Sequence, residues 1–229
     1  MTPILATRPT STTSDGGPPL LVPGVAFAAL TLGGAILGSS TPRLADTAAQ
    51  VLSYDQSHAT VMALSATMLF GSAIPLVIWA VTAYRRLGVR APGPLMGVAG
   101  GVLAAAAIAL SGLFTWTAGQ TAQLGDPALA RVLTTLSFAT GAAGFVVPFG
   151  LLIAGIAVPS LILRLLPRGV AWAGLVVAAL GMLVTLTLLT PAVDLLLPIG
   201  RFGGLIWLVV ASVLLPSGRR SRASVTDQS

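Results

Sequence analysis

The sequence predicts an all-α integral membrane protein, a single bundle of six transmembrane helices with both termini in the cytoplasm. The first observation is composition, because 55% of the 229 residues are hydrophobic and only 8% are charged, whereas about a quarter of an average soluble domain is charged. The second is a series of six apolar stretches of a length suited to a hydrocarbon core of about 30 Å. The third is the uneven distribution of arginine between the segments that join them.

The charged residues belong to few types, which removes several kinds of chemistry. All 12 basic residues are arginine, all 6 acidic residues are aspartate, and the chain has no cysteine. Disulfides, thiolate nucleophiles, thiolate-bound zinc, iron–sulfur clusters and Schiff-base lysines are therefore excluded. The net charge of +6 does not indicate nucleic acid as a partner, because the basic loops of a membrane protein produce the same surplus. The middle of each predicted span lacks ionisable residues, which disfavours proton-driven transport.

The N-terminal elements are a tail and a first span. Residues 1–19 are rich in Thr, Ser, Pro and Gly and lack apolar periodicity, so they are predicted to be a disordered tail. Residues 20–37 are uncharged and form the first predicted span, about 27 Å of helix. The small residues at 38–40 leave open a cleaved signal peptide, which we disfavour because Arg8 lies far from the apolar run.

Two further spans are predicted at 59–83 and 95–115. The first of them ends in Arg85 and Arg86, and basic residues at a span end mark a cytoplasmic loop. The second span then returns the chain to the opposite side of the membrane, where the polar loop 120–126 follows.

The next apolar segment is too long for a simple span. Residues 132–163 carry no charge and would form about 48 Å of helix, more than the thickness of a bilayer core. We expect this segment to tilt, to kink at Pro148 or Pro159, or to start above the membrane. Spans at 170–189 and 200–215 complete a transmembrane domain over 20–216, and 217–229 form a basic tail that is predicted to be disordered.

Arginine supports an orientation independently of hydropathy. Nine arginines lie at ends assigned to the cytoplasm, whereas Arg43, Arg131 and Arg201 lie at ends assigned to the outside. Because cytoplasmic loops of membrane proteins carry the excess of positive charge, this distribution predicts cytoplasmic termini.

Polar residues on the predicted outer side form the main candidate for catalysis. If residues 48–58 extend the following span as a helix, Asp55 and His58 are i, i+3 neighbours and Tyr54 lies one turn before His58. An aspartate beside an imidazole raises the pKa of that imidazole and orients its ring, as general acid–base catalysis requires. The alternative is that both are solvated residues that cap the span, and an isolated Asp-x-x-His pattern favours this alternative.

Three other outer residues complete the candidate site. Asp126, Asp194 and Arg201 lie on the same predicted side as Tyr54, and the four are candidates for binding a ligand. A metal site is not predicted, because one histidine and scattered aspartates lack the clustered spacing of metal-binding motifs. We therefore expect neither a metal nor another cofactor.

The span at 95–115 carries a ridge of small residues. Gly97, Gly101, Ala105 and Ala109 recur at i+4 spacing on one face, where another helix can approach closely. We expect the ridge to pack inside the same bundle, and a homodimer interface is the alternative.

Three short segments carry a resemblance. They are residues 46–58, which begin Asp-Thr-Ala-Ala-Gln-Val-Leu-Ser-Tyr and end in His, 166–174 (Leu-Pro-Arg-Gly-Val-Ala-Trp-Ala-Gly) and 203–215 (Gly-Gly-Leu-Ile-Trp-Leu-Val-Val-Ala-Ser-Val-Leu-Leu). Together they resemble a family of small multi-pass membrane proteins of high-GC Gram-positive bacteria, a domain of unknown function. The resemblance covers residues 20–215 and implies six spans and a bacterial plasma membrane, and it implies no activity and no site residue.

The sequence favours a function without catalysis, because it shows helices and packing devices but no reaction centre. The preferred interpretation is a membrane protein that binds a membrane lipid, an apolar small molecule or a partner membrane protein. The first alternative is a membrane-embedded enzyme for an apolar substrate, with Asp55 and His58 as acid and base. The second is a facilitator or exporter of small apolar solutes that uses Pro75, Pro148 and Pro159 as hinges.

Overall fold

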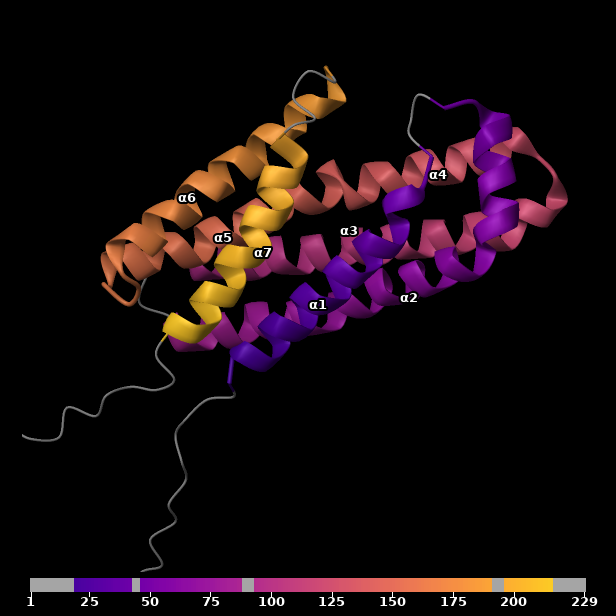
Figure 1. Ribbon diagram of the computed structural model, residues 1–229. Helices are drawn as coiled ribbons and strands as arrows, with labels where there is room; N and C mark the ends of the chain where they lie inside the picture. The colour runs from indigo at the N-terminus through magenta and orange to yellow at the C-terminus, as the bar shows by residue number, and fades with distance from the viewer. Residues whose placement is uncertain (1–18, 43–45, 88–92, 191–195, 216–229) are drawn as a thin grey trace, which may run out of the picture.

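The structure is built from helices. The computed structural model describes residues 19–42, 46–87, 93–190 and 196–215, and these residues form α-helices and short 3₁₀ helices but no strand (Figure 1). The α-helices are α1 (Leu21–Leu37), α2 (Ala48–Leu87), α3 (Pro94–Thr121), α4 (Pro127–Gly141), α5 (Ala143–Ile162), α6 (Arg168–Leu183) and α7 (Leu196–Leu214). The 3₁₀ helices are η1 (Gly38–Ser40), η2 (Ala122–Leu124) and η3 (Val184–Leu188).

Six helical stretches in the described ranges are long and apolar enough to cross a membrane. α4 and α5 together count as one of them, over Pro127–Ile162. This confirms the predicted fold class, an all-α protein with six helices suited to a bilayer. The orientation of the termini stays a prediction, because the length and apolar character of the helices do not show on which side of a membrane each end lies.

α2 bends near its start. Its 40 residues would make a straight rod of about 60 Å, twice the thickness of a hydrocarbon core. His58 has φ −123° and ψ 21°, outside the helical range, and interrupts the helix. Figure 1 shows the start of α2 turned sharply away from the rest of the helix. The bend therefore separates a short N-terminal segment of α2 from the part that is suited to span the membrane.

The long apolar segment is broken between α4 and α5. Ala142 has φ −91° and ψ −101° and lies between the two helices. Its N–H donates to the Phe138 carbonyl at 2.7 Å, and its own carbonyl accepts from the Val146 N–H at 2.8 Å. Pro148 and Pro159 both lie inside α5. The break in the 132–163 segment thus lies N-terminal to both of the prolines at which a kink was expected.

α3 and α5 meet along a contact that we call the glycine seam, formed by Gly97, Gly100 and Gly155. A Cβ atom added to Gly100 would lie 2.6 Å from the Leu152 nitrogen and 2.7 Å from the Pro148 carbonyl oxygen. A Cβ atom added to Gly155 would overlap the backbone of Gly97. Two helix backbones can approach this closely only where both lack side chains. The seam therefore joins α3 to α5 by direct contact between their backbones.

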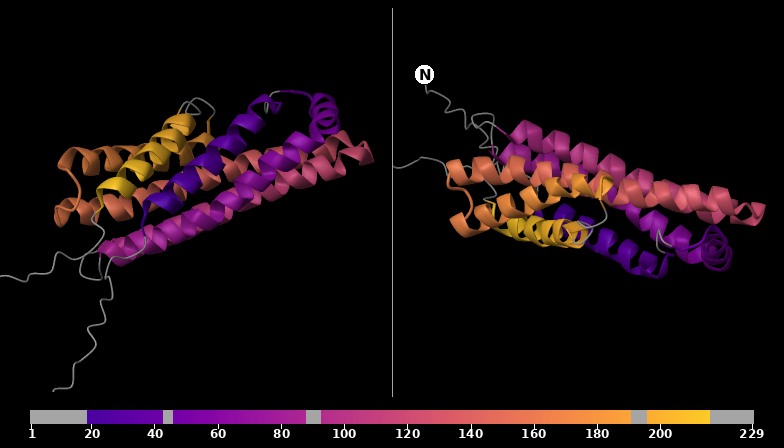
Figure 2. Two further views of the ribbon diagram at one scale, coloured as in Figure 1. Left: turned by 60° about the horizontal axis from the view of Figure 1, so that its bottom comes forward. Right: turned by 90° about the horizontal axis from the view of Figure 1, so that it is seen from above.

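The end of the bundle at which α2 begins, which we call the outer end, is assembled differently. There Met62, Ala118 and Leu133 form a small cluster separate from the main core, with Tyr54, Phe114 and Leu129 packed against it. The cluster joins α2, α3 and α4. Figure 2 shows that α3 and the start of α2 extend beyond the ends of α6 and α7 at this side. The outer end is therefore a projection built from three helices.

The four tryptophans divide between surface and interior. Trp116, near the end of α3, and Trp172, near the start of α6, are 48% and 58% exposed. Trp79 and Trp207 are buried, and their indole N–H groups donate to the Ser212 hydroxyl and to the Val170 carbonyl. Exposed tryptophans near the two opposite ends of a bundle suit the headgroup levels of a bilayer.

Candidate functional sites

His58 is partnered by its own helix. Its ring stacks on the ring of Tyr54 with centroids 4.2 Å apart. Its Nδ1 atom lies 2.8 Å from the Ser57 hydroxyl and 3.1 Å from the Tyr54 carbonyl oxygen. The Tyr54 hydroxyl lies 2.9 Å from the hydroxyl of Ser40 at the end of η1. These contacts hold the bend of α2 against the chain that follows α1.

Asp55 is buried without a partner. Its side chain is 0% exposed, and neither carboxylate oxygen has a hydrogen-bond partner within the described residues. Asp55 and His58 are therefore close in sequence but not joined by a hydrogen bond. A buried carboxylate without a partner is costly, so we expect Asp55 to destabilise the outer end.

Asp126, another aspartate of the candidate site, makes contacts of its own. Asp126 caps α4, because one carboxylate oxygen accepts the backbone N–H groups of Ala128 at 2.9 Å and Leu129 at 3.3 Å. Asp-Pro at this position is a strong start signal, since Asp is favoured at the N-cap and Pro at the first helical position. Asp194 lies outside the described residues. The structure thus gives Asp126 a structural contact.

Hydrogen bonds between helices fix the outer end. The Arg131 guanidinium on α4 donates to the Asp46 carbonyl at 2.6 Å. The Gln56 side chain on α2 donates to the Ala122 carbonyl of η2 at 3.0 Å. Within the described residues there is no group of three or more His, Cys, Asp or Glu side chains that could hold a metal ion. The polar residues at this end therefore tie backbone segments together.

Arg201 lies on α7, within one of the six apolar helices. Its guanidinium carbon lies 5.8 Å from the centroid of the Phe145 ring on α5. The Nε atom is buried and has no hydrogen-bond partner within the described residues. A cavity of about 190 Å³, the arginine pocket, lies beside it. The pocket is lined by Phe138, Gly141, Ala142, Val146, Leu197, Pro198, Arg201 and Phe202.

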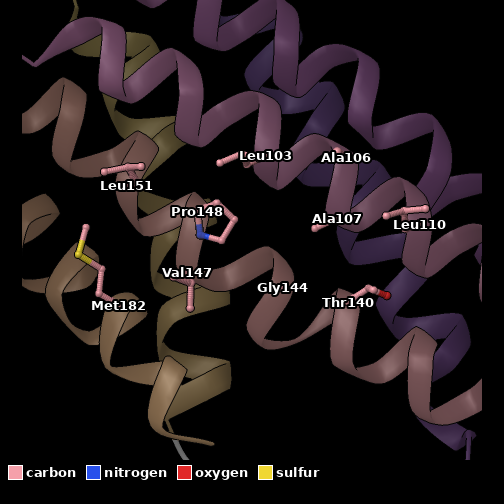
Figure 3. A pocket seen from close by; sticks show the side chains of 10 residues that line it. All are labelled: Leu103, Ala106, Ala107, Leu110, Thr140, Gly144, Val147, Pro148, Leu151 and Met182. Atoms are coloured by element: carbon pink, nitrogen blue, oxygen red, sulfur yellow. The ribbon is translucent and has the colours of Figure 1, made fainter. Parts of the chain in front are cut away.

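A second cavity is an apolar groove of about 630 Å³ between α3, α4, α5 and α6 (Figure 3). It is lined by Leu103, Ala106, Ala107, Leu110, Thr140, Gly144, Val147, Pro148, Leu151 and Met182. Thr140 supplies the one hydroxyl, which donates to the Leu136 carbonyl of its own helix at 2.7 Å. The side chains of the apolar groove therefore present hydrocarbon and no unpaired polar group.

The small-residue ridge of α3 is divided between two partners. Gly97 approaches the backbone of Gly155 on α5, and a Cβ atom added to Gly101 would lie 2.6 Å from Ala80 on α2. Ala105 is buried and Ala109 is half-buried. The close approaches of Gly97 and Gly101 are thus made within the chain.

Sequence reasoning did not identify the apolar groove or the partner of Arg201. Leucines and alanines line the groove, and these residue types occur throughout the chain, so no local signal marks them. A signal for the arginine pocket is the lone Arg201 beside an apolar run. Comparison of the chain with protein-family models, with curated proteins and with solved structures finds no match.

Proposed function

We propose that the protein is an integral membrane protein without catalysis that binds the hydrocarbon chain of a membrane lipid in the apolar groove. The observation that carries this proposal is the lining of the groove, hydrocarbon apart from the internally bonded hydroxyl of Thr140. A hydrocarbon chain in the groove gains dispersion contacts and leaves no polar side chain of the groove unpaired.

The rim of the apolar groove faces the surface on which lipid would lie. Leu103, Leu110 and Met182 line the groove and are 57%, 45% and 39% exposed. We place this surface in a bacterial plasma membrane, as the family resemblance implies, and both termini in the cytoplasm, on the basis of the nine arginines at one set of span ends. A chain from the bilayer can then enter the groove sideways.

The structure gives less support to the two alternatives. An acid–base pair needs Asp55 and His58 in contact, whereas His58 is engaged by Tyr54 and Ser57. Hinges at the prolines are not favoured either, because α2 continues through Pro75 and α5 continues through Pro148 and Pro159.

Photo-crosslinking tests the proposal. The protein is placed in nanodiscs with a phospholipid that carries a diazirine in the middle of its acyl chain, and the adducts are mapped by peptide mass spectrometry. We expect cross-links to concentrate on Leu103, Leu110 and Met182. Ala106→Phe puts a large ring into the groove and is expected to reduce these adducts. Ala99→Phe is the matched control, because Ala99 is also exposed on α3 but does not line the groove.

Two results would contradict the proposal. One is a uniform distribution of cross-links over all lipid-facing residues, which is what annular lipid gives. The other is an equal effect of Ala106→Phe and Ala99→Phe. Retained lipid counted by native mass spectrometry gives a second readout, in which Ala106→Phe loses one lipid and Ala99→Phe loses none.

A further inference from the structure

The position of Arg201 within α7 is unusual. α7 has 19 residues, about 28 Å of helix, and Arg201 follows its first residue by five positions, or about 8 Å. Its neighbour Gly200 packs against Gly181 of α6, where an added Cβ atom would lie 3.3 Å from the Gly181 Cα. Arginine at such depth is costly and marks a functional site by default.

Arg201 does not reach out of the apolar region by the usual route. A long arginine stem commonly carries the guanidinium toward the headgroups. Here the guanidinium lies over Phe145 and its Nε atom is buried without a hydrogen bond among the described residues. The side chain thus lines the arginine pocket, and its Nε atom has no acceptor among the described residues.

The start of α5 lies beside the same pocket. Ala142, which lines the pocket, has non-helical torsion angles, and α5 begins at the next residue without a side-chain cap. The first N–H groups of a helix have no partner inside it, and together they favour an anion. In α5 these groups belong to Ala143 and Gly144, but neither residue lines the pocket, and α4 ends directly before them at Gly141. The group of the arginine pocket that can bind an anion is therefore the guanidinium of Arg201.

The mouth of the arginine pocket is apolar. Phe138 and Phe202 line it and are 45% and 41% exposed. A ligand that enters past these rings has an apolar body beside its anionic group. Arginine matches the geometry of carboxylate and phosphate groups with two parallel hydrogen bonds.

We propose that Arg201 binds the oxyanion head of a membrane amphiphile, a carboxylate or a phosphate monoester, while its chain remains in the bilayer. This site shares no lining residue with the apolar groove and does not depend on it. The apolar groove indicates only a hydrocarbon chain, whereas Arg201 adds an anionic head to the expected ligand.

Binding of tritiated palmitate to the purified full chain in detergent tests the site. We expect saturable binding, and competition by methyl palmitate at least about tenfold weaker, because the ester offers no charge to the guanidinium. Unlabelled palmitate and dioleoyl phosphatidic acid are used as competitors that carry a carboxylate and a phosphate monoester. The one that displaces the labelled palmitate at the lower concentration identifies the preferred oxyanion. Inorganic phosphate that competes as well as either would overturn the assignment to an amphiphile.

Substitutions locate the binding. Arg201→Gln is expected to weaken palmitate binding about tenfold or more and to remove the preference over methyl palmitate. Arg168→Gln is the matched control, since Arg168 is an exposed arginine at the start of α6. Equal losses in the two variants, or no loss in Arg201→Gln, would overturn the site. Ala106→Phe is expected to leave palmitate binding unchanged, so failure of the groove and failure of this site are distinguishable.

A structural role for Arg201 predicts other results. Arg201→Gln removes a desolvated charge and is expected to leave the melting temperature unchanged or higher. If Asp194 is the partner of Arg201, Asp194→Asn and Arg201→Gln lower the melting temperature alike and leave palmitate binding intact, and this outcome overturns the proposal. Should Arg201→Gln fail to fold, Arg201→Lys is used instead. Lysine keeps the charge but cannot donate two parallel hydrogen bonds to one oxyanion, so we expect palmitate binding to weaken several-fold.

Discussion

Where α3 meets α5, glycines bring two helix backbones into contact, whereas at the outer end large side chains and hydrogen bonds fill the space between α2, α3 and α4. Gly100 and Gly155 leave no room for even a methyl group. At the outer end, Met62 and Leu133 pack together, and Arg131 reaches across to the backbone of Asp46. The two regions belong to one bundle but are stabilised by different interactions.

The difference follows from the solvent around each region. Lipid chains are as apolar as leucine, so helices inside a bilayer associate through close packing more than through a hydrophobic driving force. The outer end projects beyond α6 and α7 (Figure 2), where polar side chains can be satisfied by water or by each other. We therefore expect the glycine seam to be sensitive to added volume and the outer end to be sensitive to charge.

The largest effect is expected from adding volume to the seam. Gly155→Ala puts a methyl group into the backbone of α3, and we expect it to lower the free energy of unfolding by about 3 kcal/mol. Gly71→Ala is the matched control, since nothing lies within 4 Å of a Cβ atom added there. That control should stabilise α2 by up to about 1 kcal/mol through helix propensity. Unfolding in mixed micelles, followed by circular dichroism, measures both.

If Gly155→Ala has the same free energy of unfolding as the wild type, α3 and α5 can move apart to accept the methyl group without loss of stability. The comparison between the two regions would then fail, because the seam would be no tighter than an ordinary helix contact. A loss in Gly71→Ala equal to that in Gly155→Ala would point to a general effect of the substitution.

At the outer end, removal of a charge is expected to stabilise the protein. Asp55 is 0% exposed and neither carboxylate oxygen has a partner among the described residues. Asp55→Asn keeps the shape of the side chain and removes the buried charge, so we expect the free energy of unfolding to rise by about 1–2 kcal/mol. The same micelle titration measures it. A decrease instead would mean that the carboxylate has a favourable partner, and it would revive the interpretation of Asp55 as a functional acid.

Asp126 should respond in the opposite direction to Asp55. Its carboxylate accepts the Ala128 and Leu129 N–H groups at the start of α4. Asp126→Ala removes the cap and is expected to lower the free energy of unfolding by about 1 kcal/mol. Asp126→Asn is the control, because asparagine caps a helix about as well as aspartate. If both variants lose the same stability, the charge of Asp126 matters more than its hydrogen bonds.

The fold class was predictable because it depends on composition and on the length of apolar runs, which do not require knowledge of packing. The break at Ala142 was not. Its neighbours in the sequence, Gly141 and Gly144, are compatible with a membrane helix, whereas Pro148 and Pro159 carry the usual signal for a kink. Prolines inside a membrane helix are tolerated when neighbouring groups satisfy the freed carbonyls, so proline alone is a weak predictor of where such a helix breaks.

The candidate site was predictable in part. Asp126 precedes a proline, and this pair signals the start of a helix, so its role as a cap could have been inferred from sequence. The burial of Asp55 could not, because it depends on the bend at His58 and on the helices that pack around it. Arg201 was recognised as a candidate ligand residue, but its stacking on Phe145 joins α7 to α5 across 56 positions of sequence, and local pattern carries no information about such a contact.

The smallest effect is expected from a hydrogen bond inside the bundle, which sharpens the contrast with the seam. The Trp79 indole N–H donates to the Ser212 hydroxyl at 2.7 Å, and both residues are buried. Hydrogen bonds between membrane helices contribute about 0.6 kcal/mol on average. A double-mutant cycle of Trp79→Phe and Ser212→Ala should give a coupling energy of that size. A coupling as large as the loss in Gly155→Ala would show that polar contacts, rather than close backbone packing, hold the apolar part of the bundle together.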